Sequence, residues 1–242
     1  MSGRAPAPRA VAAHAKVELV QLLRSGESLL VTFGLPLSLL VFLALADILP
    51  VAFLVPGTLA ISVMAAGLVS LAIATGFERK YGVLKLLSVA PLPPGGLVAG
   101  KAAALLALLA LQAILTVSVG AALGWRFGGS VVAALLALLL GGVAFGAIGL
   151  LLAGTLRAEG TLAAANGLFV VLVAVSGIAY PLERGPDGLA AIARVLPSGA
   201  LGAALRAALD APGTFAVGAL LVLLAWAVVA VVAAARWARW EP

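Results

Sequence analysis

Six long apolar runs alternate with short polar segments along the whole chain. They cover residues 29–49, 51–76, 102–124, 131–155, 161–180 and 215–235. At about 1.5 Å per helical residue, each run is long enough to cross the roughly 30 Å of a bilayer core. The pattern predicts an all-α, polytopic membrane protein with six transmembrane helices in a single domain, 1–242. Two helices fall within 28–76, three within 101–180 and the last, with a cytoplasmic tail, within 213–242.

Charged residues avoid the centres of these runs. No Asp, Glu, Lys, Arg or His lies in the middle of any of them, where a charge would cost about 2.5–3.5 kcal/mol of insertion free energy. A gradient-driven secondary transporter would normally place a carboxylate or histidine near the midplane and would often show inverted repeats. Neither is evident, so we expect the energy for any transport to come from a partner.

The composition excludes several classes of protein. A soluble globule is excluded because 64% of the 242 residues are hydrophobic and the mean hydropathy is +1.24. The chain has no cysteine, which excludes disulfides, thiolate catalysis and Cys-ligated metals. The single histidine, His14, is expected to be a solvated tail residue rather than a metal ligand. Asp47, Glu78 and Glu159 are isolated acids on different sides of the membrane, so no catalytic or metal site is predicted.

Lys and Arg residues are divided unevenly between the two sides of the predicted bundle. Eleven of the 15 lie on the side that holds both termini, and the other side has Arg126, Arg184, Arg194 and Arg206. The positive-inside rule therefore predicts a multi-pass protein of the inner (plasma) membrane with both termini in the cytoplasm. The basic residues are scattered over short loops without a recognition module, which argues against nucleic acid as a partner.

Residues 1–27 are predicted to form a cytoplasmic tail and an interfacial helix. Between about residues 10 and 26 one stripe is apolar and the opposite side is polar: Val11, Ala15, Leu19 and Leu22 against His14, Glu18, Gln21, Arg24 and Ser25. Such a helix beside a spanning segment is typical of the membrane interface, and a frayed tail is the alternative. Disorder is expected only for 1–9, where Pro6 and Pro8 oppose a helix.

The polar segment 77–100 is predicted to contain a short amphipathic helix on the cytoplasmic side. At helical spacing one face is polar and the other apolar: Glu78, Tyr81, Lys85 and Ser88 against Val83, Leu84 and Leu87. The prolines of 91–94 end it. A plain connector would need only a few polar residues, so a structured one indicates a docking surface.

A glycine-rich segment that follows imitates a phosphate-binding loop. Residues 95–101, ending in Gly100 and Lys101, fit the G-x-x-x-x-G-K pattern. The next residue is Ala102, which has no hydroxyl for Mg²⁺, and no strand precedes the segment. We therefore interpret Lys101 as a basic anchor at the inner end of the third span.

The segment 181–212 is predicted to form an exoplasmic, re-entrant helical hairpin. Two helical pieces, 188–196 and 199–209, flank Pro197 and Ser198, and neither is long enough to cross a bilayer. A lid over the outer end of the bundle is the functional interpretation, and an ordinary exoplasmic loop is the alternative.

A few neutral polar residues and one small-residue stripe lie inside the predicted spans. Gln112, Thr116 and Asn166 either line a substrate path or satisfy one another through hydrogen bonds of roughly 1 kcal/mol. The stripe from Gly142 to Ala153 allows close helix approach, either within the chain or at a dimer seam. An interior so poor in polar groups suits a hydrophobic or amphiphilic substrate.

Along essentially its whole length the sequence resembles the membrane subunit of ABC-2 type ABC transporters, also called the type V exporter fold. Three features carry the resemblance: the helix before the first span, the segment with Glu78, Arg79, Gly82, Lys85 and Leu86 that looks like the coupling helix of the family, and Ser176, Gly177, Pro181 and Pro197, which look like its exoplasmic hairpin or gate. Ser198, Gly199 and Ala200 depart from the bulkier residues of many relatives, which leaves the substrate open.

The resemblance implies a permease that works with two copies of a cytoplasmic ABC ATPase subunit and with a second permease chain, identical or different. ATP and Mg²⁺ would then bind the partner, with no cofactor in this chain and no enzymatic activity of its own. The expected function is ATP-driven efflux, as in multidrug export, of a drug, antibiotic, lipid or glycan. A gradient-driven secondary transporter is the alternative.

Overall fold

The computed structural model describes residues 7–24, 30–84, 95–182, 188–210 and 215–239. Within these residues the chain is helical and has no strand. The helices are α1 (Ala7–Arg24), η1 (Leu30–Gly34), α3 (Leu35–Leu45), α4 (Val51–Met64), η2 (Ala65–Ser70), α5 (Leu71–Lys80), α7 (Gly96–Ala122), α8 (Val131–Thr155), α9 (Ala158–Val175), α10 (Leu189–Val195), α11 (Pro197–Asp210) and α12 (Val217–Trp237).

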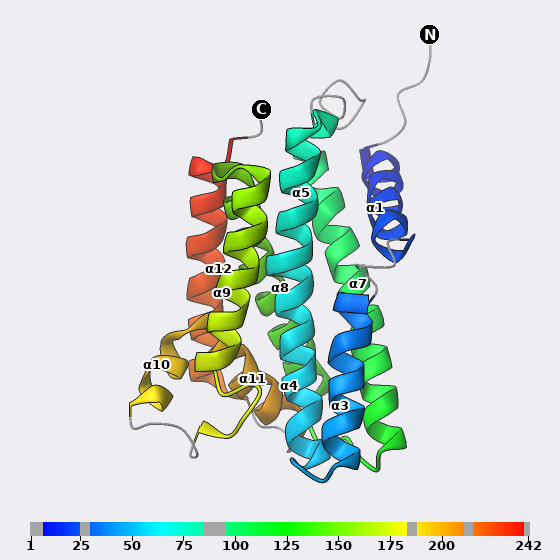
Figure 1. The fold of residues 1–242 in the computed structure, drawn as a ribbon, viewed down its shortest axis with the longest axis vertical. Helices are drawn as coiled ribbons and strands as arrows, with labels where there is room; N and C mark the ends of the chain where they lie inside the picture. Colours follow the sequence, from blue (N-terminus) through cyan, green and yellow to red (C-terminus); the bar gives the residue numbers. More distant parts are fainter. Residues whose placement is uncertain (1–6, 25–29, 85–94, 183–187, 211–214, 240–242) are drawn as a thin grey trace.

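The predicted class, an all-α polytopic membrane protein, is confirmed. In the described part, five helices are long and apolar enough to cross a membrane: Val51–Lys80, which joins α4, η2 and α5, and then α7, α8, α9 and α12. A sixth is counted only if α10 and α11, bent by 87°, are taken as one span. The spans run side by side as a bundle, with both termini at one end and α10 and α11 towards the other (Figure 1). We call these the terminal end and the hairpin end.

The first apolar run forms a shorter helix than the sequence predicts. The sequence suggests a span over 29–49, whereas the apolar helix of this region covers Thr32–Leu45, about 21 Å at the α-helical rise. The chain then turns at Asp47, whose φ of +53° is one that Asp tolerates better than most residues. α3 consequently lies beside the hairpin half of the bundle, below α1 (Figure 1).

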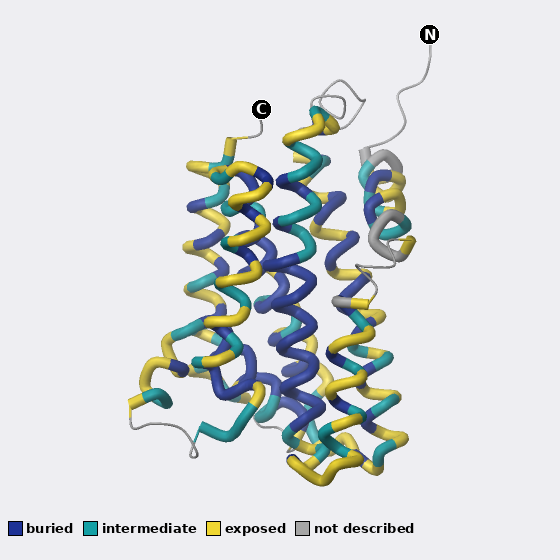
Figure 2. The backbone as a smooth tube through the Cα atoms, viewed as in Figure 1, coloured by how far each residue is buried: buried dark blue, intermediate teal, exposed yellow. Residues whose placement is uncertain are grey.

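The long helix Val51–Lys80 is at the centre of the bundle, and its middle is the most buried part of the molecule (Figure 2). α8 packs closely on this helix and on α7 because its small residues leave room. A Cβ atom at Gly149 would overlap the carbonyl of Gly67 in η2, and one at Gly142 would lie 2.9 Å from the Leu109 side chain of α7. The small-residue stripe therefore serves packing within the chain.

The hairpin segment is built into the bundle. α11 contacts α4, α8 and α12, and most of its residues are buried, including Leu201 and Leu205. A Cβ atom at Gly199 would overlap the carbonyl of Ala193, so glycine permits the sharp turn between α10 and α11. The predicted pair of short helices is thus present, with Pro197 as the first residue of α11.

α1 lies alongside the first turns of α7 at the terminal end (Figure 1). It begins at Ala7, so the prediction of disorder is wrong for residues 7–9. Pro8 falls in the first turn of the helix, where no helical hydrogen bond is lost.

Candidate functional site

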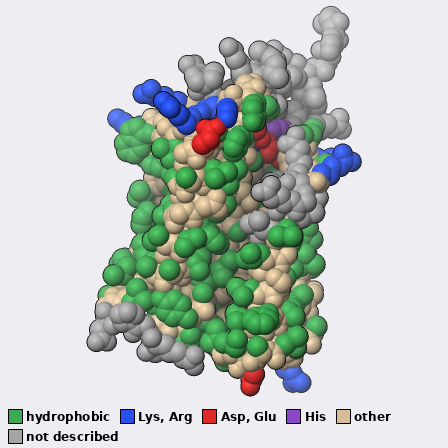
Figure 3. Space-filling view, in the orientation of Figure 1, with side chains coloured by type: hydrophobic (Ala, Val, Ile, Leu, Met, Phe, Trp, Pro, Cys, Tyr) green, Lys and Arg blue, Asp and Glu red, His purple; other side chains and the backbone are tan. Residues whose placement is uncertain are grey.

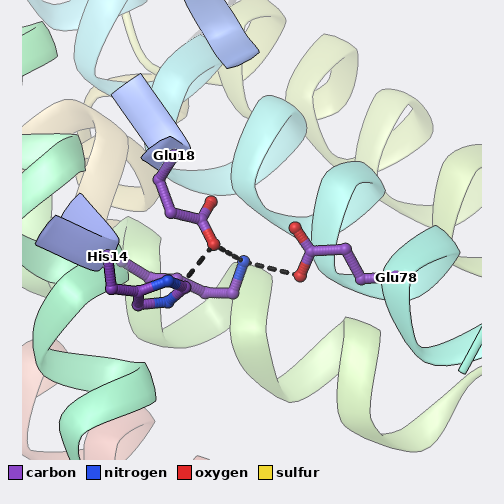
Figure 4. A network of polar contacts seen from close by, with 4 residues as sticks. His14, Glu18 and Glu78 are labelled. Carbon is purple, nitrogen blue, oxygen red and sulfur yellow. Dashed lines mark hydrogen bonds and ion pairs between the residues drawn. The ribbon is translucent and has the colours of Figure 1, made fainter. Parts of the chain in front are cut away.

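A buried group of ionisable side chains joins α1, α5 and α7 at the terminal end (Figure 4). The Lys101 ammonium donates a hydrogen bond to Glu18 Oε1 of α1 at 2.8 Å, and its Nζ lies 2.7 Å from Glu78 Oε2 of α5. The Lys101 side chain is only 1% exposed. We call His14, Glu18, Glu78 and Lys101 the Lys101 cluster.

The charges of this cluster depend on one another. A buried ammonium is tolerated when opposite charges surround it, and removing its partners typically costs about 3–5 kcal/mol. Here one cation serves two carboxylates, from α1 and from α5. Lys101 lies near the start of α7, where the sequence predicts a basic anchor, and its stem and its charge are both enclosed by neighbouring helices.

His14 belongs to the same cluster and is not solvated, contrary to the sequence-based expectation. Its residue exposure is 9%, and its Nε2 lies 3.5 Å from Glu18 Oε1. The imidazole packs over Gly100, where a Cβ atom would overlap the ring. The side of α1 that carries His14 and Glu18 therefore faces α7, while Val17 is exposed. The helical spacing placed His14 and Glu18 on one side of the helix but could not show that this side faces Lys101 on α7.

A second set of contacts holds α5 to the α8–α9 corner. The Arg79 guanidinium donates to the carbonyl of Leu156, just after α8, and at 3.2 Å to that of Arg239, after α12. Lys80 forms an ion pair with Glu159 on α9, and both side chains are largely exposed. The end of α5 is therefore held by Glu78 on one side and by Arg79 and Lys80 on another.

The structure places the predicted coupling residues only in part. Glu78 and Arg79 lie in the last turn of α5, so residues 77–80 continue the spanning helix instead of starting a separate one. Glu78 is turned towards Lys101, whereas Tyr81, expected on the same face, is 70% exposed. Gly82 has a φ of +74°, with open space where a Cβ atom would lie. Lys85 and Leu86 lie outside the described residues.

The residues proposed to line a path lie in different surroundings. Gln112 is buried and donates from Nε2 to the carbonyl of Thr32 in η1 at 2.8 Å. Thr116 is also buried on α7. Asn166 is on the exposed side of α9 and donates to Leu162 of its own helix. Thr32 and Ser70, whose hydroxyl oxygens are 3.4 Å apart, complete a mid-depth polar group that no sequence motif indicates.

The residues that the sequence predicts as a gate lie in a closed joint between α9 and α11 at the hairpin end. Gly177 has a φ of +68°, and the Ser176 hydroxyl accepts a hydrogen bond from the Ile178 amide at 3.2 Å. Arg206 of α11 donates to the carbonyl of Gly177 at 2.6 Å and stacks over the Phe53 ring at 4.3 Å. The sequence marked Arg206 only as a lone charge on an Ala/Leu-rich face.

Pro181 and Pro197 flank this joint: Pro181 is half-buried and Pro197 is buried. Beside the joint is a cavity of about 480 Å³ whose lining includes Ser176, Arg194, Arg206 and Gly218. The hairpin end therefore has a hydrogen-bonded joint between α9 and α11 and, beside it, a cavity bordered by α12.

On the face seen in Figure 3, charged side chains gather towards the two ends of the molecule, and the described surface between them is largely hydrophobic. In the described part of the chain, no group of three or more His, Asp or Glu side chains is arranged to hold a metal ion.

Comparison with models of protein families identifies one match, over residues 28–236, to the model described as ABC-2 family transporter protein. A search of curated proteins found no match. The matched range begins after α1, and it includes Glu78 and Lys101 but not His14 and Glu18.

Proposed function

Because this chain belongs to the ABC-2 family of transporter proteins, we propose that it is the membrane-spanning subunit of an ATP-driven exporter. The family makes the chain a multi-pass membrane permease of an ABC transporter, a transport component that associates with an ABC ATPase and is not itself catalytic. Our proposal concerns the direction of transport, the substrate and the assembly.

The proposed substrate is hydrophobic or amphiphilic: a drug, an antibiotic, a lipid or a glycan. Support comes from the neutral character of the bundle at mid-depth, where Gln112, Thr32 and Ser70 are the polar groups in contact. A strongly charged substrate would need compensating charges in this region, and no apolar run carries one in its middle.

The proposed assembly contains two permease chains, identical or different, and two copies of a cytoplasmic ATPase subunit that binds ATP and Mg²⁺. The terminal end would face the cytoplasm of a cell whose inner (plasma) membrane holds the complex. Arg79, Lys80, Lys101, Arg157, Arg236 and Arg239 support this orientation, because all six belong to the side predicted to be cytoplasmic. The ATPase would dock on the loop that joins α5 to α7.

The main support for the proposal is that no apolar run has a charged residue in its middle. A proton- or sodium-driven carrier needs an ionisable or ion-binding group that meets both sides of the membrane in turn. The Lys101 cluster, the buried ionisable group described above, lies near the terminal end, with Lys101 about one and a half turns into α7. Energy from a partner ATPase fits this arrangement best.

The proposal is tested by reconstitution into vesicles with a short-chain fluorescent phospholipid and a lipophilic dye as probes. The chain alone should neither hydrolyse ATP nor concentrate either probe. With its ATPase, ATP and Mg²⁺ it should move at least one of them after ionophores have collapsed all ion gradients. Transport by the chain alone, driven by an imposed pH difference, would instead establish the gradient-driven secondary transporter.

A further inference from the structure

The cavity at the hairpin end is wide because the residues around it are small. Its volume of about 480 Å³ lies within the range of pockets that bind small molecules. Most of its lining residues are alanine or glycine, from α10, α11 and α12: Ala193, Gly199, Ala200, Ala203, Gly218 and Ala219. A Cβ atom at Gly218 would meet nothing within 4 Å, so the space beside α12 is open. The walls of the cavity are therefore mainly apolar.

Two arginines border this cavity, and their surroundings differ. Arg206 is held by the carbonyl of Gly177 and by the Phe53 ring, and Asp210 on the same helix interacts with it electrostatically. Arg194 is exposed and, within the described part of the chain, its guanidinium forms no hydrogen bond or ion pair. Arg194 is therefore the cation that can meet a ligand in the cavity.

The position of Arg194 at the edge of the cavity is fixed by α12. The Trp226 indole donates from Nε1 to the carbonyl of Val195 at 2.9 Å, which ties the end of α10 to α12. Ile192 and Val195, on either side of Arg194, are 53% and 63% exposed. Such apolar surface faces acyl chains in a membrane, where a cation needs an anionic partner.

The depth of the cavity matches the boundary between lipid headgroups and acyl chains. Its lining residues on α12 lie in the first two turns of that helix, and Val222, the last of them, is about 8 Å along the axis from Val217. Amphiphilic groups at this boundary have their apolar part about 5–10 Å deep. The cavity thus offers a charged edge and apolar walls at the depth where an amphiphile has its head and the start of its chain.

We propose that this cavity binds a phosphate-headed lipid of the leaflet at the hairpin end. The Arg194 guanidinium donates to the phosphate oxygens, for which its planar fork is well suited. The start of an acyl chain lies against the small side chains of α11 and α12. The site needs only the membrane-embedded fold, so it stands whether or not the proposed function holds.

Two kinds of variant test the site, each with a matched control. Arg194→Gln removes the cation, and Arg126→Gln removes another exposed arginine of the hairpin end that does not line the cavity. Gly218→Leu fills the cavity from α12, where a side chain has room, and Gly167→Leu adds the same side chain at an open position of α9. Ala203→Leu fills the cavity from α11, where Ala203 is exposed.

Binding is measured by native mass spectrometry of the full chain in detergent, titrated with phosphatidylglycerol. The wild type should bind one lipid at this site. Arg194→Gln should weaken binding about tenfold or more, the usual effect of losing hydrogen bonds to a charged group. Gly218→Leu and Ala203→Leu should also weaken it, whereas Arg126→Gln and Gly167→Leu should bind as the wild type does. Thermal unfolding without added lipid should show that all five variants are folded.

Two fragments of the lipid separate the contributions of head and chain. Dioleoylglycerol has the chains without the phosphate, and glycerol phosphate has the phosphate without the chains. Both should bind more weakly than phosphatidylglycerol. Equal binding of dioleoylglycerol would overturn the role of the phosphate, and equal binding of glycerol phosphate would make the site one for a free phosphate.

The source of the ligand is tested with the chain produced without any ATPase and purified without added lipid. A phospholipid should then copurify with the wild type and be depleted in Arg194→Gln, because a resident lipid needs no transport to reach the site. Occupancy only in the presence of an ATPase would instead identify a transported amphiphile and overturn the proposal. It is also overturned if Arg126→Gln weakens binding as much as Arg194→Gln, or if neither cavity-filling variant affects binding.

Discussion

At the scale of single residues, the close contacts of this bundle depend on where a side chain is missing. Gly149 of α8 faces the backbone of Gly67 in η2, and no other residue could lie there without a shift of the helices. Gly167 of α9 occupies an equally ordinary helical position but has open space around it. Glycine is thus needed for packing at one position and not at the other, and composition alone does not show which is which.

We predict that Gly149→Ala lowers the free energy of unfolding by about 1–3 kcal/mol, because the added methyl group overpacks the α8–η2 contact. Gly167→Ala should be neutral or raise it by up to about 1 kcal/mol, because alanine favours the helix. Thermal unfolding of the two variants in the same detergent compares them directly. Equal destabilisation by both would show that the α8–η2 contact is not as close as the structure has it.

At the scale of elements, the sequence predicted the positions of the helices well. It predicted less well which side of each helix is buried. The apolar periodicity located the five long spans and the two helices of the hairpin. It could not show that residues 77–80 extend α5, since an amphipathic pattern is compatible with a separate helix and with a span that leaves the membrane. Nor could it place His14 and Glu18 inside, because their burial depends on Lys101, more than 80 residues away.

The sequence did not indicate the mid-depth contact between Gln112 of α7 and Thr32 of η1, and this contact can be tested by mutation. Gln112→Met removes the donor to the Thr32 carbonyl and leaves that buried acceptor unsatisfied, at a cost of about 1–3 kcal/mol. We expect faster hydrogen exchange in 30–34 and lower thermal stability. Asn166→Leu is the control, because Asn166 bonds only within α9 and is exposed. Unchanged exchange in 30–34 for Gln112→Met would contradict the assigned contact.

At the scale of the whole molecule, the two ends differ in chemistry. The terminal end carries the Lys101 cluster, the Arg79 contacts and the Lys80–Glu159 pair, whereas the hairpin end is closed by α11 and the Arg206 joint. The proposed function would have the groups of the terminal end contact the ATPase and those of the hairpin end form the gate on the opposite side. Which end faces the cytoplasm decides whether the proposed coupling is possible at all.

The absence of cysteine from the chain allows this orientation to be measured cleanly. Tyr81→Cys lies at the terminal end and Phe127→Cys at the hairpin end, and both parent side chains are exposed, at 70% and 45%. The excess of Lys and Arg at the terminal end predicts that a membrane-impermeant thiol reagent, added to intact cells, labels position 127 and not position 81. Position 81 should become reactive only after the membrane is permeabilised, which also shows that its thiol is accessible. Labelling of position 81 from outside would place the α5–α7 loop away from any cytoplasmic ATPase, and the proposed docking would then fail together with the orientation.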